Sequence, residues 1–190
     1  MAALRPERAG GYAAPMPNAA PVLETQRLLL RGHRREDLSD CLSMWSDPNV
    51  VRFIGGRAFT EEEVWARMHR YAGHWALMGY GYWLIAEKGS QRFVGEAGFA
   101  DFKRELTPSF GGAPEAGWAL ASWAHGRGYA TEALQAAAAW LDADLGRKRT
   151  VCMIDDKNAA SVRVAAKLGF REWTRTTYKG SPTVLFERPA

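Results

Sequence analysis

The stretch His125-Gly126-Arg127-Gly128-Tyr129-Ala130-Thr131-Glu132-Ala133-Leu134 places two glycines directly before a run of helix-forming residues. Glycine adopts backbone conformations that other residues avoid, and it lets a ligand approach the chain closely. The first turn of a helix has N–H groups without partners and a partial positive charge. Together these features predict a phosphate site that needs no charged side chain, and hence a phosphorylated cofactor.

The helix that follows this turn is expected to extend to about Leu145, with Gly146 ending it. A strand is expected before the turn, over residues 115–121, and another after the helix, over residues 150–154. A strand–helix–strand unit of this kind brings its two strands together in parallel, either paired or splayed apart.

The spacing of apolar residues predicts the other elements. Thr60, followed by three glutamates, is a typical helix start, and Gly79 is a typical helix end. The remaining expected helices cover residues 34–46, 60–78 and 158–168. The remaining expected strands cover residues 25–31, 82–87, 92–101, 170–178 and 183–187.

This order of elements predicts an α/β (α+β) fold with a mixed, mostly antiparallel sheet that contains one splayed parallel pair and is flanked by helices. A single domain is expected over residues 22–188. Residues 1–21 are rich in Ala, Pro and Gly and lack the apolar core of a secretory signal. They are therefore expected to form a flexible tail.

The composition excludes several classes of protein. The formal net charge of +4 suits an anionic small ligand and is too weak to indicate nucleic acid by itself. No apolar run approaches the roughly 18 residues of a membrane span. The two cysteines, Cys41 and Cys152, lack the spacing of a metal site and are expected to be buried hydrophobic residues. We therefore expect a cytoplasmic protein with no structural metal.

Four motifs occur in order along the chain: LETQRLLLR (23–31), VGEAGF (94–99), WAHGRGYATEA (123–133), and NAAS (158–161) followed by KLGF (167–170). With them the sequence resembles the GNAT superfamily of acyl-CoA N-acyltransferases, in particular the branch with the ribosomal-protein N-acetyltransferases. The resemblance covers about residues 22–188. It implies a GNAT-like fold and an acetyl-CoA-dependent N-acetyltransferase.

The resemblance also implies where acetyl-CoA binds. The backbone of Gly126 to Thr131 would hold its diphosphate, and the pantetheine arm would lie beside the strand residues Trp118, Ala119, Leu120 and Ala121. The family usually has Gln or Arg where this chain has His125, which can still donate a hydrogen bond. Arg127 and Thr131 could add direct contacts to phosphate, although both also suit a solvated surface.

The second acyl-CoA motif contains two further candidates. Asn158 is expected to cap a helix, to contact the cofactor through its amide, or to do both. Ser161 lies three residues later and points along nearly the same side of the helix. Many relatives have a tyrosine, at the position of Ala165 here, that protonates the leaving thiolate. Ser161 is the substitute that the resemblance implies, with helix capping or a cofactor contact as its alternatives.

The attacking amine must lose a proton, and a carboxylate or a water chain must accept it. Glu115, at the start of the strand that leads to the cofactor, is the first candidate for this base, and an exposed strand-end glutamate is its alternative. Glu96 is the second, because an acid in an otherwise apolar strand needs a reason. The helix dipole explains Glu132 without any catalytic role.

The sequence has no nucleophile elbow, so direct attack in a ternary complex is expected rather than an acyl-enzyme. The acceptor is a primary amine, either a protein N-terminus or a small, amino-acid-like compound, in a monomer or a homodimer. Two other interpretations stay open. One is an acyl-CoA sensor without turnover, and the other is a nucleic-acid or ribosome-binding module suggested by the basic run 147–149.

Overall fold

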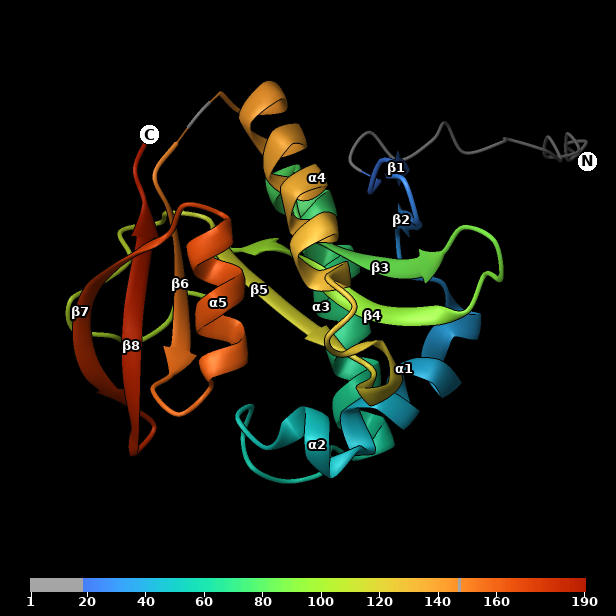
Figure 1. Cartoon of the computed structure of the whole chain (residues 1–190), viewed down its shortest axis with the longest axis horizontal. Coiled ribbons are helices and arrows are strands. Elements are labelled where there is room, and N and C mark those ends of the chain that lie inside the picture. Colours follow the sequence, from blue (N-terminus) through green and yellow to red (C-terminus); the bar gives the residue numbers. More distant parts are fainter. Residues whose placement is uncertain (1–18, 147) are drawn as a thin grey trace, which may run out of the picture.

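The computed structural model of this protein describes residues 19–146 and 148–190. In this part of the chain, one sheet of eight strands has the order β1-β2-β3-β4-β5-β6-β8-β7 (Figure 1). The strands are β1 (Leu23–Glu24), β2 (Leu28–Arg31), β3 (Tyr82–Glu87), β4 (Phe93–Ala100), β5 (Glu115–Leu120), β6 (Thr150–Asp155), β7 (Arg171–Tyr178) and β8 (Ser181–Arg188). The helices are α1 (Leu38–Ser46), α2 (Pro48–Val51), α3 (Glu61–Met78), α4 (Tyr129–Asp144) and α5 (Ala159–Lys167), with 3-10 turns η1 (Arg35–Asp37) and η2 (Ser122–Ala124).

All neighbouring strands are antiparallel except β5 and β6, which are parallel and share the single register pair Glu115–Val151. Beyond that pair the two strands diverge, as Figure 1 shows. The predicted fold class is therefore confirmed, including the splayed parallel pair. The strand–helix–strand order explains the pair, because α4 carries the chain from the end of β5 back to the start of β6.

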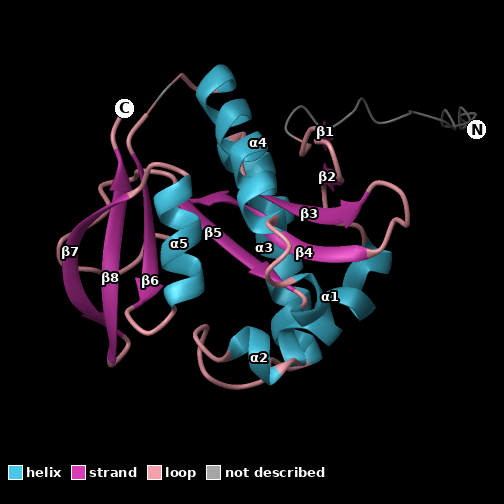
Figure 2. Ribbon diagram, viewed as in Figure 1, coloured by secondary structure: helices cyan, strands magenta, loops and turns pink. Residues whose placement is uncertain are grey.

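The two faces of the sheet are covered by different helices (Figure 2). Trp83 and Ile85 of β3 belong to a cluster with the apolar residues of α4 and α5. Leu84 and Ala86, which point to the opposite face, belong to a cluster with α1, α2 and the first half of α3. This alternation follows from the period of two along a strand, and it gives the protein a three-layer core.

The predicted helix over residues 60–78 is confirmed as α3. Thr60 accepts a hydrogen bond from the backbone of Glu63, and the Glu63 side chain accepts one from the backbone of Thr60. This reciprocal pair satisfies two amides that a helix start leaves without partners. Gly79 ends the helix with a left-handed backbone.

One local prediction is wrong. Residues 25–31 do not form one strand, because Thr25 N bonds Leu28 O at 2.9 Å and makes a turn between β1 and β2. The short helix α2, which follows α1 directly, was not predicted: the Asp47 side chain accepts a hydrogen bond from Asn49 N, and Pro48 occupies the first turn, where its missing N–H costs nothing.

Both cysteines are buried and have free thiols, as predicted. Within residues 19–146 and 148–190, no helix combines the length and apolar character that a membrane crossing requires. Residues 1–18 of the predicted tail lie outside the described residues.

Candidate active site

The glycine turn lies at the N-terminus of α4 and is exposed to solvent. Gly126 and Gly128 both have left-handed backbones, with φ of +74° and +80°. The first backbone hydrogen bond of the helix runs from Glu132 N to Gly128 O at 3.0 Å, so the three preceding amides have no partner within the helix. Tyr129 is buried, and its hydroxyl donates to Glu87 at 2.5 Å. Because the side chain is engaged there, Tyr129 can contribute to the turn only through its backbone amide.

Glu132 fixes this turn to the segment between β1 and β2. Its carboxylate accepts hydrogen bonds from Thr25 Oγ1 at 2.6 Å and from Arg27 Nε at 2.7 Å. Arg27 Nη1 also donates to the carbonyl of Arg127 at 3.0 Å. Burial raises the pKa of Glu132, but the hydrogen bonds from Thr25 and Arg27 outweigh that effect and hold the pKa below its ordinary value. Glu132 thus positions the turn, a role beyond the helix-dipole effect expected for it.

Two side chains that were expected at the cofactor have partners within the protein. His125 Nε2 lies 2.8 Å from Leu120 O, so the imidazole bonds the end of β5. The guanidinium carbon of Arg127 lies 5.3 Å from the centre of the Trp123 ring. These contacts hold the side chains of His125 and Arg127 beside the turn. That either side chain binds a cofactor stays a prediction.

The splayed strands leave an open backbone edge beside the turn. In the described part of the chain, residues 116–120 of β5 pair with β4 on one side and with no strand on the other. Trp118 and Ala119 line the cleft, whereas Ala121 N is bonded to Val94 O at 2.9 Å. An extended ligand can pair with such an edge as an additional strand.

The start of α5 faces this edge from the β6 side. Asn158 caps the helix, because its side-chain oxygen accepts from Ser161 N at 3.1 Å. The predicted capping role of Asn158 is thus confirmed. Ser161 is partly buried and lines the cleft, whereas Ala165 is completely buried. Ser161 is therefore a hydroxyl-bearing residue on the wall of the cleft, and Ala165 has no group for proton transfer.

A cleft of about 1090 Å³ opens between the two halves of the sheet. One wall comes from β5, another from the end of β6 with the start of α5, and a third from the segment 52–59 and α3. Both predicted base candidates, Glu96 and Glu115, line this cleft and are buried. The fold therefore brings the open strand edge, Ser161 and two carboxylates to one cavity.

Glu115 forms a bidentate ion pair with Arg104. Arg104 Nε lies 2.5 Å and Nη2 lies 2.7 Å from the two carboxylate oxygens. Burial raises the pKa of Glu115 above its ordinary value, and the opposing effect of the Arg104 guanidinium is smaller. A carboxylate with a raised pKa is a better proton acceptor near neutral pH, so the environment of Glu115 suits the predicted role.

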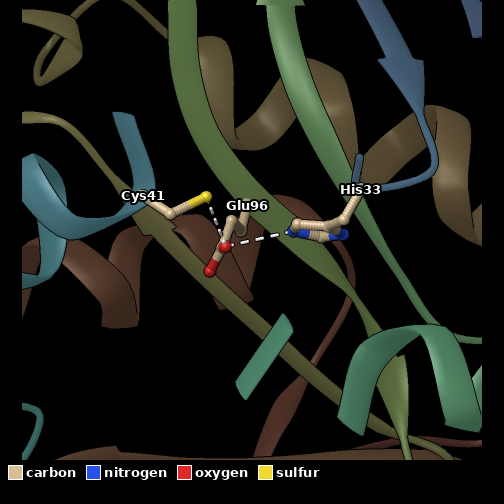
Figure 3. Close-up of side chains that lie close together, drawn as sticks. All are labelled: His33, Cys41 and Glu96. Atoms are coloured by element: carbon tan, nitrogen blue, oxygen red, sulfur yellow. Dashed lines mark hydrogen bonds and ion pairs between the residues drawn. The ribbon is translucent and has the colours of Figure 1, made fainter. Parts of the chain in front are cut away.

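Glu96 lies at the centre of a second, deeper cluster (Figure 3). One carboxylate oxygen lies 3.0 Å from His33 Nε2 and 3.4 Å from Cys41 Sγ, and the other accepts from Trp45 Nε1 at 2.9 Å. Burial raises the pKa of Glu96, but the contacts with His33 and the nearby charge of Arg67 outweigh it and lower the pKa. These partners explain how an acid is tolerated in an apolar strand.

His33, Cys41 and Glu96 are also residue types that bind metal ions, and their ligand atoms all lie within 4.8 Å of one another. Hydrogen bonds already account for this arrangement, because the thiol of Cys41 donates to Glu96. Burial and the Glu96 charge raise the pKa of Cys41, which keeps the thiol protonated as the donor of that bond. The prediction that the protein has no metal stays a prediction.

The family model described as Acetyltransferase (GNAT) domain matches residues 27–171. The chain belongs to the GNAT family of acetyltransferases. A solved GnaT-family acetyltransferase from Bordetella pertussis is 35% identical to this GNAT protein with a TM-score of 0.79, and the match covers 88% of this chain and 99% of that one.

Two more distant relatives agree with this assignment. The "Uncharacterized N-acetyltransferase p20" of Bacillus licheniformis is 26% identical over 152 residues, which are 80% of this chain and 83% of that protein. RimL, a ribosomal L7/L12 alpha-N-protein acetyltransferase solved in complex with coenzyme A, has a TM-score of 0.72 at 16% identity, over 89% of this chain and 98% of that one. At that identity the likeness to RimL shows the fold alone.

Two residues around the cleft carboxylates, Arg67 and His33, are absent from the sequence-based site. Arg67 lies against the ring of Trp45, and His33 bonds Glu96 directly. One signal was available, since Arg67 and Tyr71 are four residues apart on a predicted helix and so lie on one face. The basic run 147–149 is described in part: Arg149 pairs with Glu187 at 2.8 Å, and Arg147 lies outside the described residues.

Proposed function

We propose that this GNAT acetyltransferase transfers the acetyl group of acetyl-CoA to a primary amine by direct attack in a ternary complex. The observation that carries the proposal is the meeting of the glycine turn, the open edge of β5 and two buried carboxylates around one cleft. The acceptor is a protein N-terminus or a small amine. The activity for which RimL is named supports the first of these, and the enclosed cleft supports the second.

The residues present fit coenzyme A. Left-handed glycines and partner-free amides at the start of α4 suit a diphosphate, and the unpaired edge of β5 suits an extended arm with amide groups. When bound, acetyl-CoA supplies the thioester carbonyl that the amine attacks. The chain itself must orient the amine, accept its proton and stabilise the thiolate.

We assign these roles to three residues. Glu115 accepts the proton of the amine, because burial raises its pKa. Glu96 stays ionised beside His33 and helps to orient the wall of the cleft through its bonds with His33 and Trp45. Ser161 donates a hydrogen bond or a proton to the thiolate, since its hydroxyl lines the cleft opposite the open edge of β5.

The experiment is calorimetric titration with acetyl-CoA, followed by thiol release with panels of peptides and small amines. We expect binding and turnover, and Glu115→Gln should lower kcat by about a hundredfold or more, the usual contribution of a general base. Glu105→Gln is the matched control, because Glu105 is an exposed acid in the loop that precedes β5. Binding without turnover on any amine would instead favour the sensor interpretation, and no binding would refute the proposal.

A further inference from the structure

Arg67 of α3 is a mostly enclosed cation on the wall of the cleft. Its guanidinium carbon lies 4.0 Å from the centre of the Trp45 ring and 4.9 Å from that of Phe59. Its Nη1 donates to the hydroxyl of Tyr71 at 3.2 Å. Two aromatic rings and one phenol therefore hold the guanidinium in place on the wall of the cleft.

This cation lacks a carboxylate partner. No described carboxylate lies within 4.0 Å of the Arg67 guanidinium, and Arg67 Nε is buried without a hydrogen-bond partner. Glu96 is near enough to interact with it, but both Glu96 oxygens already accept bonds from His33, Cys41 and Trp45. Leaving a buried guanidinium without an anion is costly, so the site is incomplete as it stands.

The other charges of the cleft also favour a ligand with a negative group. Of the five carboxylates on its walls, four already face cationic or imidazole partners: Glu63 faces Arg57, Glu96 faces His33, Asp101 faces Lys103, and Glu115 faces Arg104. The fifth, Asp155, has no ion pair with a described residue. Arg52 and Arg70 line the same cleft and, like Arg67, have no ion pair with any described carboxylate. A cleft with this surplus of positive charge repels a simple ammonium ion. An acceptor that brings its own negative group removes the repulsion.

We propose that the acceptor is an amine that also carries a carboxylate, and that Arg67 and the hydroxyl of Tyr71 bind this carboxylate. This inference rests on the proposed function and names its substrate class. A guanidinium binds a carboxylate through two parallel N–H···O bonds, and its two Nη atoms can supply such a fork while Nε stays enclosed. Tyr71 completes the site, because its oxygen accepts from Arg67 and its hydrogen can be donated to the ligand. Burial raises the pKa of Tyr71 to about 12, so the phenol keeps that hydrogen.

Two sources could supply such a group: a free amino acid, or a peptide with an acidic residue after its N-terminal amine. The test therefore uses matched pairs of acceptors. One arm compares alanine with alaninamide and methionine with methioninamide. The other compares the peptide amides Ala-Asp-NH₂ and Ala-Asn-NH₂. Thiol release gives kcat/KM for each, calculated per neutral amine because the amine pKa differs between an acid and its amide.

We expect the wild-type enzyme to prefer the carboxylate member of at least one pair by about tenfold to a hundredfold, the value of a charge-assisted hydrogen bond. The arm that shows the preference identifies the source. Arg67→Gln should reduce the preference to about one, and this ratio is the readout because both members of a pair experience any general effect of the substitution equally. Arg67→Lys, which keeps the charge and loses the fork, should retain only part of the preference. Arg57→Gln is the matched control, because Arg57 lines the same cleft but is already paired with Glu63 at 2.5 Å.

Several outcomes would overturn the inference, and they differ from failure of the proposed function. Equal kcat/KM values for the neutral and the carboxylate acceptors would refute the carboxylate site, and so would a preference that survives Arg67→Gln. Either result would leave the protein an active acetyltransferase. Turnover of no amine at all would refute both. If Arg67→Gln fails to fold by thermal unfolding, Arg67→Lys carries the test, and an unchanged preference in that variant would count against the proposal.

Discussion

Replacing the glycines of the turn before α4 by alanine separates the strain of the turn from its binding of phosphate. Gly126 and Gly128 both have left-handed φ values, +74° and +80°. An added Cβ at position 128 would meet only Arg27 Nη2, at 3.5 Å, and one at position 126 would meet nothing within 4 Å. The protein itself therefore offers no steric obstacle to either alanine.

The loss of stability should then come from backbone strain alone. A left-handed conformation costs an L-residue about 1–2 kcal/mol. For a domain of this size, each 1 kcal/mol lowers the Tm by roughly 2–4 °C, so each variant should melt about 2–8 °C lower than the wild-type protein. Gly146→Ala is a matched control, because Gly146 follows the other end of α4, has φ of +71° and has open space around its Cβ position.

The affinity for coenzyme A should separate the variants. A methyl group at Gly126 or Gly128 occupies the space through which a phosphate approaches the amides, so we expect a Kd at least about tenfold higher, a loss of about 1.4 kcal/mol. Gly146→Ala should melt at a similarly reduced temperature and bind coenzyme A like the wild-type protein. Differential scanning calorimetry and isothermal titration measure the two quantities. An unchanged Kd in both turn variants would show that the turn does not bind phosphate, and an equal loss of affinity in Gly146→Ala would show a global effect.

Three further predictions concern the cleft. Ser161→Ala should lower kcat and leave the Kd for coenzyme A unchanged, because only its backbone amide contributes to the Asn158 cap; an unchanged kcat would assign thiolate stabilisation to another group. The lowered pKa of Glu96 stabilises the fold above the ordinary glutamate pKa, and this contribution is lost as the pH falls through the folded-state pKa. The difference in Tm between wild type and Glu96→Gln should therefore shrink as the pH falls from about 7 to about 3, and a constant difference would contradict the ionised assignment. Because hydrogen bonds from His33, Cys41 and Trp45 already satisfy the Glu96 carboxylate, purified protein should contain well under one equivalent of zinc by mass spectrometry of the metal, with activity unaffected by a chelator; stoichiometric zinc would make the His33 cluster a metal site.

Patterns local in the sequence predicted most of the fold. Thr60 with its three glutamates, Gly79 and the glycine turn each report on a few neighbouring residues, and the structure has helix boundaries at all three. The segment 25–31 was misjudged because its turn combines local and distant contacts. Leu28 N donates to Thr25 Oγ1 at 2.9 Å within the segment, whereas Glu132, more than a hundred residues away, accepts from Thr25 and Arg27.

The candidate site likewise has features that the sequence predicts and features that it does not. The open edge of β5, the Asn158 cap and the burial of Glu96 and Glu115 follow from strand order and helix signals. The partners of the two acids could not be read, because Arg104 comes from a loop and His33 from the segment after β2. Which cation meets which carboxylate depends on three-dimensional packing, and hydropathy carries no information about charge pairing.

The divergence of β5 and β6 also bears on how this protein avoids aggregation. An unpaired strand edge at the rim of a sheet is a template for aggregation, and proteins protect it with charges, bulges or short strands. Here the unpaired edge lies in the middle of the sheet, with Trp118 and Ala119 on one wall of the cleft and Met153 and Ile154 on the other. A thin, extended molecule can enter that space, but the sheet of another folded protein cannot. Placing the edge in the interior thus keeps a strand available for pairing without exposing it to self-association.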